Sequence, residues 1–348
     1  MKLFVTGGAG FIGANFIRHL ILKRSDIEIV NYDKLTYAGN LDNLHDIETS
    51  SRYRFVRGDI ADAASVLTAM DGCDCVVHFA AESHVDRSIY DPSACVATNV
   101  LGTSVLLQVA RRVKVRRFIH ISTDEVYGDL EPGQASDESF PLRPSSPYAA
   151  SKAGADLLVK SYVRTYDFPA IITRASNNYG PFQFPEKLIP LMIARALEGR
   201  TLPVYGDGQQ ERDWLHVEDH CSAIILVLER GSIGETYNIG GGNVLRNLDL
   251  VRQILTVLDR PESLISFVAD RPGHDRRYAL DCRKISSHLG WRPEVSFADG
   301  IRKTAQWYQD NRQWLDNVQS GDYQRYYSMY YQDRDASLKR VTAGGANQ

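Results

Sequence analysis

A hydroxyl group and two adjacent carboxyl groups stand together in the sequence at Thr123, Asp124 and Glu125. They follow the apolar run of residues 117–121, which has the character of a β-strand. Because open α/β sheets bind their ligands beyond the carboxyl ends of the strands, this position favours a chemical role. Two neighbouring carboxyl groups can acquire different pKa values and then act as acid and base. A solvated loop, in which such residues are common, is the competing interpretation.

Tyr148 and Lys152 form a second pair, in a segment predicted to be a helix that begins near Ser145 or Pro147. Residues four apart share one helix face. An ammonium group beside a phenol lowers the pKa of the phenol, and such a tyrosine can take the proton of an alcohol as hydride leaves. A surface helix pair explains the spacing equally well. The pair gains specificity because it follows the Thr123 hydroxyl by 25 residues.

The chain begins with elements that are typical of a dinucleotide site. A strand at residues 3–5 runs into a turn with Gly7, Gly10 and Gly13, and a helical pattern follows at residues 14–22. Glycines let the backbone approach a pyrophosphate, whose charge is met by the amino end of the helix.

The second strand, residues 27–32, ends at Asp33, 20 residues after the last glycine of the turn. An acid at that distance is expected to bind the ribose hydroxyls of the cofactor. Its charge would repel a 2′-phosphate and therefore favours NAD over NADP. An ordinary turn aspartate after a strand is the alternative.

Strands and helices continue to alternate, which indicates βαβ units and a parallel sheet. Further strands are expected at residues 53–56, 74–79, 170–174 and 237–239, and helices at 99–113, 186–197, 248–258 and 297–314. The fold class is therefore α/β: a Rossmann-type doubly wound parallel sheet with a smaller α/β C-terminal substrate-binding part. We expect an NAD-binding domain with the catalytic residues at 1–180, a substrate part at 181–335 with segments that return to the sheet, and a flexible tail at 336–348.

The composition excludes several classes of protein. Among 348 residues, 40 basic and 43 acidic side chains give a net charge of −3, which argues against nucleic acid as a partner. Five irregularly spaced cysteines indicate thiols in a reducing compartment, and Cys73 with Cys75 lacks a second pair, so we expect no metal site. Neither a signal peptide nor an apolar run of membrane-spanning length is found, so we expect a cytoplasmic protein without membrane contact.

Together, the glycine turn, Asp33, Thr123 and the Tyr148–Lys152 pair resemble the extended short-chain dehydrogenase/reductase superfamily, in its branch that modifies nucleotide sugars. Within that branch, residues 122–128 are similar to the motif of the dTDP-glucose 4,6-dehydratases. The segments 33–40, 80–88 and 271–278 match the same family, and the resemblance covers the chain to about Tyr331.

The resemblance implies a reaction that is redox-neutral overall. Tyr148 would take the proton of the sugar 4-hydroxyl while hydride passes from C4 to NAD, with Thr123 on that oxygen and Lys152 supporting the phenolate. Glu125 would abstract the C5 proton, and a protonated Asp124 would release the 6-hydroxyl as water. Hydride return to C6 would give dTDP-4-keto-6-deoxy-glucose, with NAD tightly bound and regenerated in each cycle.

The resemblance also assigns binding residues. For the cofactor they are Gly7, Gly10, Phe11, Ile12, Gly13, Asp33, Lys34, Leu35, Thr36, Gly39, Asp59, Ile60, Ala80, Ala81, Ser83, Thr98, Tyr148, Lys152 and Asn178. For the sugar nucleotide they are Ser83, His84, Thr123, Asn177, Lys187, Leu188, Pro203, Tyr205, Arg212, Asn247, Arg271, His274 and Tyr278.

Other functions stay open at this point. A UDP-glucose 4,6-dehydratase or a nucleotide-sugar 4-epimerase would share most of these residues, although an epimerase needs no elimination and gives Asp124 and Glu125 no task. A non-catalytic NAD sensor would be expected to lack Tyr148 or Lys152. The resemblance further implies a homodimer joined through the helices near 99–113 and 148–166. From its aromatic composition, the stretch at 323–331 is expected to pack back or join an interface.

Overall fold

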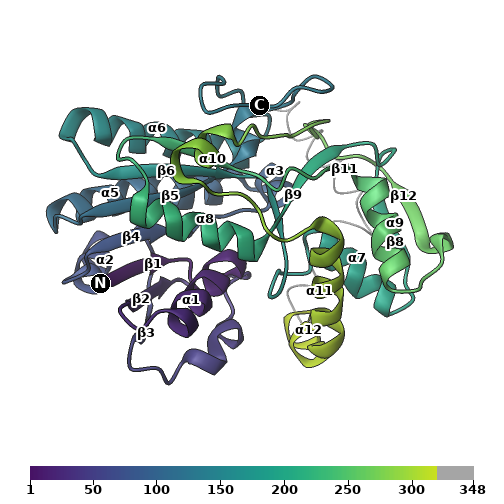
Figure 1. The fold of residues 1–348 in the computed structure, drawn as a ribbon, viewed down its shortest axis with the longest axis horizontal. Coiled ribbons are helices and arrows are strands. Elements are labelled where there is room, and N and C mark those ends of the chain that lie inside the picture. Colours follow the sequence, from purple (N-terminus) through teal and green to yellow (C-terminus); the bar gives the residue numbers. More distant parts are fainter. Residues whose placement is uncertain (320–348) are drawn as a thin grey trace, which may run out of the picture.

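The structure, a computed structural model, describes residues 1–319. Its centre is a seven-stranded parallel sheet in the order β10-β6-β5-β4-β1-β2-β3 (Figure 1). The strands are β1 (Lys2–Thr6), β2 (Glu28–Asp33), β3 (Tyr53–Arg57), β4 (Cys75–His78), β5 (Arg117–Thr123), β6 (Ala170–Ala175) and β10 (Thr236–Ile239). The strand order reverses between β1 and β4, which is the switch point where such sheets bind ligands. The predicted Rossmann-type α/β fold is confirmed.

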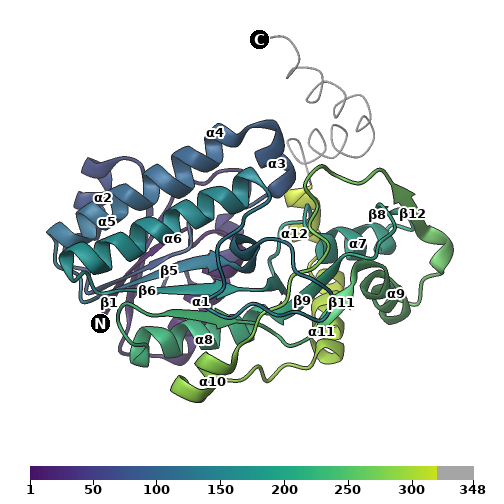
Figure 2. The ribbon, with the colours of Figure 1, turned by 90° about the horizontal axis from the view of Figure 1, so that it is seen from above.

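Helices cover both faces of this sheet, as Figure 2 shows. One layer contains α2 (Ala63–Met70), α5 (Thr103–Arg112) and α6 (Pro147–Tyr166), and the other contains α1 (Phe11–Lys23), α8 (Val217–Arg230) and α10 (Arg283–Leu289). Successive strand residues alternate between the two cores: Phe4 packs under the first layer, whereas Leu3 and Val5 pack under the second. The sheet is therefore buried on both faces, as parallel sheets are.

A smaller C-terminal part packs against the carboxyl edge of the sheet (Figure 1). Its strands are β7 (Asn177–Tyr179), β8 (Leu202–Tyr205), β9 (Glu211–His216), β11 (Val244–Arg246) and β12 (Ile265–Val268). Its helices are α7 (Leu188–Leu197), α9 (Asn247–Val257), the short η4 (Glu262–Leu264), α11 (Phe297–Asp310) and α12 (Arg312–Val318). A third apolar core, which includes Met192, Ile254 and Tyr308, holds these elements together.

Several helices differ from the predicted ranges. The helix expected at 99–113 is a continuous run of 21 residues, made of α4 (Pro92–Cys95), the π-helical η2 (Val96–Gly102) and α5. With a mean hydropathy of 1.4 it is long and apolar enough to cross a membrane, so the expectation of no such run is wrong. Its most apolar window is 44% buried within the protein, and core helices of soluble proteins meet the same criterion.

The carboxyl-terminal helices also differ in detail. The helix expected at 297–314 is divided by Asn311, whose φ of −115° and ψ of 45° are not helical. Helix α9 begins at Asn247, one residue before the expected start at 248, and its N-cap is Arg246. The predicted aromatic stretch 323–331 and the predicted tail 336–348 lie outside the described residues.

A buried polar network joins α6 to the sheet. Arg174 of β6 donates from Nε to Asp156 Oδ2 at 2.8 Å and from Nη1 to the Tyr127 hydroxyl at 2.9 Å. The Tyr127 hydroxyl in turn donates to Asn238 Oδ1 of β10 at 2.7 Å. Burial alone would raise the pKa of Asp156. The hydrogen bond with His120 and the charge of Arg174 together have the larger, opposite effect and lower the pKa to about 2, so the carboxylate stays ionised.

We predict that Arg174→Met lowers the free energy of unfolding by about 3–5 kcal/mol, because it leaves the Asp156 charge buried without its partner. Urea unfolding at neutral pH measures the effect. The matched control is Arg252→Met, which removes the exposed Arg252–Glu262 pair at 3.1 Å and should cost at most about 1 kcal/mol. Equal losses in the two variants would contradict the prediction.

Candidate active site

A cavity of about 290 Å³ opens at the switch point of the sheet. Its wall is formed by the glycine turn, the ends of β2 and β5, the segment after β4, the first turns of α6 and residues 175–187. All five predicted catalytic residues line it: Thr123, Asp124, Glu125, Tyr148 and Lys152. The strand-end position predicted from the sequence therefore brings them to one place.

The glycine turn forms a close-fitting cradle. Gly7 has a φ of 70°, and a Cβ on it would lie 2.5 Å from the backbone nitrogen of Ala80. A Cβ on Gly13 would lie 2.4 Å from the carbonyl oxygen of Gly7. Helix α1 begins at Phe11, and its N-cap, Gly10, provides no capping side chain, so the first amides are available to an anion. This backbone fits the pyrophosphate of a dinucleotide.

Asp33 is held by the backbone at the end of β2. One carboxylate oxygen accepts from the N–H of Ala9 at 2.9 Å and the other from the N–H of Leu35 at 2.8 Å. The carboxylate lines the cavity, where a ribose would find acceptors for its hydroxyls and a phosphate would be repelled. Of the predicted cofactor residues, Leu35 is the one that does not line the cavity, and it acts on the site through Asp33. Lys34 pairs with Asp59 at 2.7 Å.

The short helix η3 (Asp124–Tyr127) carries the two carboxyl groups. Thr123 caps it by accepting from the N–H of Glu125 at 3.3 Å, and its hydroxyl donates to Asp124 Oδ1 at 3.2 Å. Burial raises the pKa of Asp124 well above its usual value, and the charges of Glu125 and Asp213 raise it further. Asp124 is therefore suited to act as an acid.

Glu125 has a different environment on the same turn. Burial raises its pKa, but the positive charges of Arg271, Lys187 and Arg212 oppose that rise. The carboxylate form is thus better supported on Glu125 than on Asp124, and two adjacent carboxyl groups acquire separate roles.

Helix α6 places the second pair. Ser146 caps the helix by accepting from the N–H of Ala149, and Pro147 occupies its first position. The hydroxyls of Thr123 and Tyr148 are hydrogen-bonded, which joins the end of β5 to this helix. Lys152 donates from Nζ to the carbonyl oxygen of Ile121 at 2.7 Å, and burial lowers its pKa to about 8.

The expected lowering of the tyrosine pKa is not found in this structure. Burial raises the pKa of Tyr148 well above its usual value, and the charge of Glu125 raises it further. Lys152 shares the helix face as predicted, but its ammonium group is directed to the Ile121 carbonyl. The four-residue spacing predicted that Tyr148 and Lys152 share a helix face, but it did not predict the direction of the Lys152 side chain.

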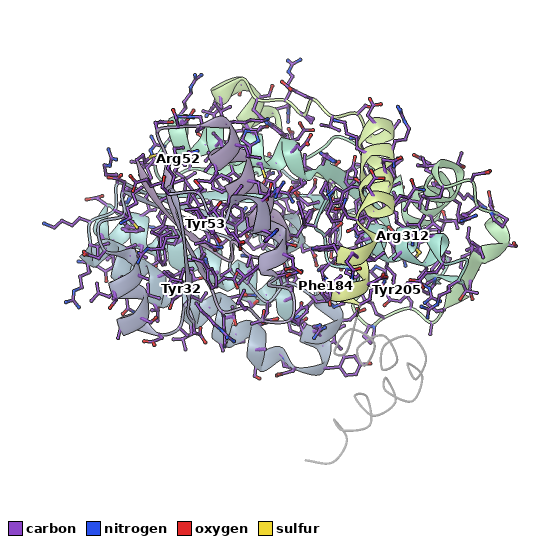
Figure 3. All side chains as sticks on the ribbon, turned by 90° about the horizontal axis from the view of Figure 1, so that it is seen from below. Tyr32, Arg52, Tyr53, Phe184, Tyr205 and Arg312 are labelled. Atoms are coloured by element: carbon purple, nitrogen blue, oxygen red, sulfur yellow. The ribbon has the colours of Figure 1, made fainter. Side chains whose placement is uncertain are left out.

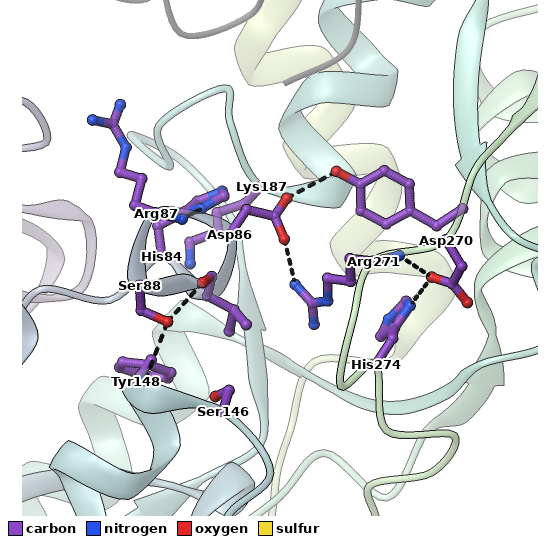
Figure 4. Close-up of polar contacts among 12 residues, drawn as sticks. His84, Asp86, Arg87, Ser88, Ser146, Tyr148, Lys187, Asp270, Arg271 and His274 are labelled. Atoms are coloured by element: carbon purple, nitrogen blue, oxygen red, sulfur yellow. Dashed lines mark hydrogen bonds and ion pairs between the residues drawn. The ribbon is translucent and has the colours of Figure 1, made fainter. Parts of the chain in front are cut away.

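The predicted substrate residues divide into two sets. Ser83, Thr123, Asn177 and Lys187 line the cavity. The others do not line it. His84 is the N-cap of α3 (Val85–Tyr90), and the rest lie in the C-terminal part: Leu188, Pro203, Tyr205, Arg212, Asn247, Arg271, His274 and Tyr278. Asp86 of α3 accepts hydrogen bonds from Arg271 Nη1 at 3.1 Å and from the Tyr205 hydroxyl at 2.9 Å. Figure 4 shows Arg271 reaching Asp86. This contact ties the second set to the Rossmann part.

The second set is positively charged and holds unpaired polar atoms. Arg212 lies with Cζ 4.2 Å from the centre of the Tyr278 ring, and its charge, like that of Arg271, reaches Glu125. Within residues 1–319, Arg271 Nε and Asn247 Oδ1 are buried and have no hydrogen-bond partner. Buried polar groups are normally paired, so Arg271 Nε suits an anionic group of a ligand and Asn247 Oδ1 suits a donor such as a hydroxyl.

Some residues at the cavity were not predicted. Those with polar or large side chains include Glu82, Gln183, Phe184, Glu186 and His220. Figure 3 shows Phe184 between Tyr32 of the sheet and Tyr205 of the C-terminal part in that view. Glu186 directly precedes the predicted Lys187, and this adjacency is a feature of the sequence that could have identified it as a cavity residue. The other positions depend on the course of an irregular segment and of α8, which no spacing in the sequence reveals.

A Rossmann sheet with a glycine cradle, an acid after β2 and a Tyr-x-x-x-Lys helix beside the cradle is the arrangement of an extended short-chain dehydrogenase/reductase. The family model of GDP-mannose 4,6 dehydratase matches residues 4–304. A dTDP-glucose 4,6-dehydratase of Shigella flexneri is 52% identical, covering 96% of this chain and 100% of that protein.

Solved structures agree with this assignment. DesIV, a dTDP-glucose 4,6-dehydratase from Streptomyces venezuelae with NAD and TYD bound, matches with a TM-score of 0.89 and 52% identity over 91% of this chain and 100% of that chain. A UDP-glucose 4-epimerase of Thermus thermophilus in complex with NAD matches with a TM-score of 0.82 and 31% identity over 89% of this chain and 100% of that chain. The chain belongs to the dTDP-glucose 4,6-dehydratase family.

We predict that Asp124→Asn stabilises the protein at neutral and alkaline pH. The raised pKa means that the folded state binds a proton that the unfolded chain releases above about pH 4, so the wild type loses stability as pH rises. Asparagine resembles the neutral carboxyl group and removes that loss. Urea unfolding between pH 5 and pH 8 should show a gain that grows with pH, and a gain independent of pH would contradict this account.

Proposed function

We propose that this protein is a dTDP-glucose 4,6-dehydratase, an NAD-dependent hydro-lyase that yields dTDP-4-keto-6-deoxy-glucose. The observation that carries the proposal is the buried pair Asp124 and Glu125, whose surroundings favour different protonation states, next to the hydrogen-bonded Thr123 and Tyr148. A 4-epimerase only oxidises and reduces C4 and has no use for this pair.

The first task of the chain's own residues is to deprotonate the sugar 4-hydroxyl. Tyr148 accepts that proton as its base, and the Thr123 hydroxyl holds the same oxygen by a hydrogen bond. Lys152, which is largely protonated below its pKa of about 8, would favour the phenolate only if its ammonium group turned from the Ile121 carbonyl toward Tyr148. NAD, when bound in the glycine cradle, accepts the C4 hydride and later returns it to C6.

The second task is the elimination of water across C5 and C6. A ketone at C4 makes the C5 hydrogen acidic, and Glu125 removes it as base. Asp124 donates its proton to the 6-hydroxyl, which leaves as water. Glu125, after its proton has exchanged with solvent, delivers a proton to C5, and the proton that Tyr148 took from the 4-hydroxyl balances the one that Asp124 lost.

The substrate's diphosphate would be bound on the C-terminal part. Arg212, Arg271 and Lys187 supply three cations whose charges all reach Glu125, and guanidinium groups bind phosphate oxygens in pairs. Asn177 Oδ1 lines the cavity wall, is buried and lacks a partner among the described residues, so it is available to the sugar nucleotide.

We also propose that the protein works in the cytoplasm as a homodimer. The helix of residues 92–112 and the adjacent α6 expose Val96, Leu101 and Leu157 at 55%, 54% and 58%. An apolar face shared by two packed helices suits a second copy of the chain. Light scattering would report twice the 39.1 kDa chain mass if this is right and a single chain mass if it is wrong.

The proposed roles predict different defects in the two halves of the reaction. Glu125→Gln should still oxidise C4 and accumulate NADH absorbance, because its base is needed only afterwards. Tyr148→Phe should slow oxidation itself, and each variant should lower turnover by about 10²- to 10⁴-fold. Rapid-mixing absorbance of NADH and the colour that 4-keto-6-deoxy sugars develop in alkali measure the two steps.

Wild-type protein incubated with dTDP-glucose and no added NAD should form the keto sugar, and UDP-glucose should react more slowly. A folded, NAD-loaded protein that is silent with both sugars would refute the proposed function. A Glu125→Gln variant with full turnover would refute the role of the carboxyl pair alone.

A further inference from the structure

Three segments that are distant in the sequence meet beside the cavity. They are the loop after β2 with Tyr37, helix α3 with Arg87, and the segment before α7 with Glu186. Arg87 Cζ lies 3.6 Å from the centre of the Tyr37 ring, and Arg87 Nε lies 3.3 Å from Glu186 Oε2. The Tyr37 hydroxyl is hydrogen-bonded to Glu186. Each of the three side chains therefore contacts the other two.

The cluster joins one buried residue, Glu186, to two half-buried ones, Tyr37 and Arg87. Glu186 is 4% exposed, and the edge of one aromatic ring meets the other where Phe184 packs on Tyr37, with ring centres 5.8 Å apart. Burial and the charge of Glu186 raise the pKa of Tyr37 well above its usual value, so it remains a phenol that donates to the carboxylate. Because a buried carboxylate that loses its partners is costly, these contacts form or break together.

The cluster borders the cavity on two of its segments. Thr36 and Gly39, on the loop of Tyr37, line the cavity, and Glu186 lines it from the segment before α7. The loop of Tyr37 is also tied to the glycine cradle, since the N–H of Asn40 donates to the Ala9 carbonyl at 3.0 Å. A ligand in the cavity thus lies between the cradle on one side and the joined loops on the other.

Asp86 and Arg87, which are adjacent on helix α3, contact different parts of the site. Figure 4 shows the Arg87 side chain pointing away from Asp86 and Arg271. Asp86 contacts Arg271 and Tyr205 on the sugar-nucleotide side, and Arg87 contacts the loops at the cofactor cavity. A change at Arg87 is therefore expected to act on the cofactor rather than on the substrate.

We propose that Arg87, Tyr37 and Glu186 form a cofactor latch, which joins two loops over bound NAD and sets how slowly it dissociates. They are positioning residues, since they act through the loops and not on the reacting atoms. The inference rests on the proposed function only in requiring NAD in this cavity. Retention matters to a redox-neutral cycle, because NADH lost after C4 oxidation would leave the keto intermediate without the hydride needed at C6.

The test compares Arg87→Gln, which removes both the ion pair and the ring contact, with Tyr37→Phe, which removes only the hydroxyl. The matched control is Arg252→Gln, which removes the exposed Arg252–Glu262 pair on and beside α9. Bound NAD per chain is measured after gel filtration. Its dissociation rate is then followed by native mass spectrometry as unlabelled NAD exchanges with isotopically labelled NAD.

Arg87→Gln should release NAD about tenfold faster or more, as expected when one partner of a buried charge pair is removed. Turnover should then depend on added NAD and recover when NAD is saturating. Tyr37→Phe should lie between Arg87→Gln and the wild type, and it decides the question if Arg87→Gln does not fold. The control should exchange NAD at the wild-type rate.

Wild-type exchange rates in both latch variants would overturn the inference. So would an exchange rate in the control as fast as in Arg87→Gln, since that would reflect general loosening. Wild-type protein that binds no NAD at all would instead count against the proposed function, so the two failures are distinguishable.

Discussion

The positions of the Tyr148 phenol and of the Asp124 and Glu125 carboxyl groups depend on one buried ion pair, between Arg174 and Asp156. Asp156 lies on α6, one turn beyond Lys152, so the pair fixes the helix that carries the Tyr148 phenol. The other arm of the Arg174 guanidinium holds Tyr127, the last residue of the η3 turn that carries the two carboxyl groups. The Arg174 side chain thereby positions α6, which carries the base for the oxidation step, relative to the η3 turn, which carries the groups for the elimination step. Because a buried charge without its partner strongly destabilises the protein, the contacts of Arg174 are kept or lost together.

The acid and the base differ in surroundings rather than in chemistry. Asp124 is 3% exposed and has the negative charges of Glu125 and Asp213 near it, which keeps its proton in place. Glu125 faces the cations of the C-terminal part, which would also bind a diphosphate. The substrate site and the base are thus coupled electrostatically. A buried carboxyl group that must hold a proton costs stability above its normal pKa, and function explains why it is kept.

Local spacing predicted much of this site. The glycine turn, Asp33 and the Tyr148–Lys152 pair were all found from the sequence, because each depends on residues within one or two adjacent elements. The latch around Arg87 was missed because a loop, a short helix and the segment before α7, all distant in the sequence, create it. Asp213 was missed because β9 approaches η3 only in the folded C-terminal part.

The errors have similar physical causes. The apolar pattern predicted a helix at residues 99–113 but not its extension to residue 92 through a π-helical stretch, which periodicity does not encode. Residue spacing placed Lys152 on the face of Tyr148, yet the direction of its ammonium group depends on the Ile121 carbonyl of a neighbouring strand. Element type followed from the sequence, whereas contacts between elements did not.

The most direct test of the account follows one hydrogen through the reaction. Substrate dTDP-glucose carrying deuterium at C4 is converted in ordinary water, and the product is examined by NMR and mass spectrometry. An internal transfer combined with elimination predicts that the deuterium appears at C6 of the 4-keto-6-deoxy sugar. A parallel reaction of unlabelled substrate in deuterated water should place solvent deuterium at C5. Deuterium that remains at C4, in a sugar that has not lost water, would contradict the account and indicate epimerase chemistry.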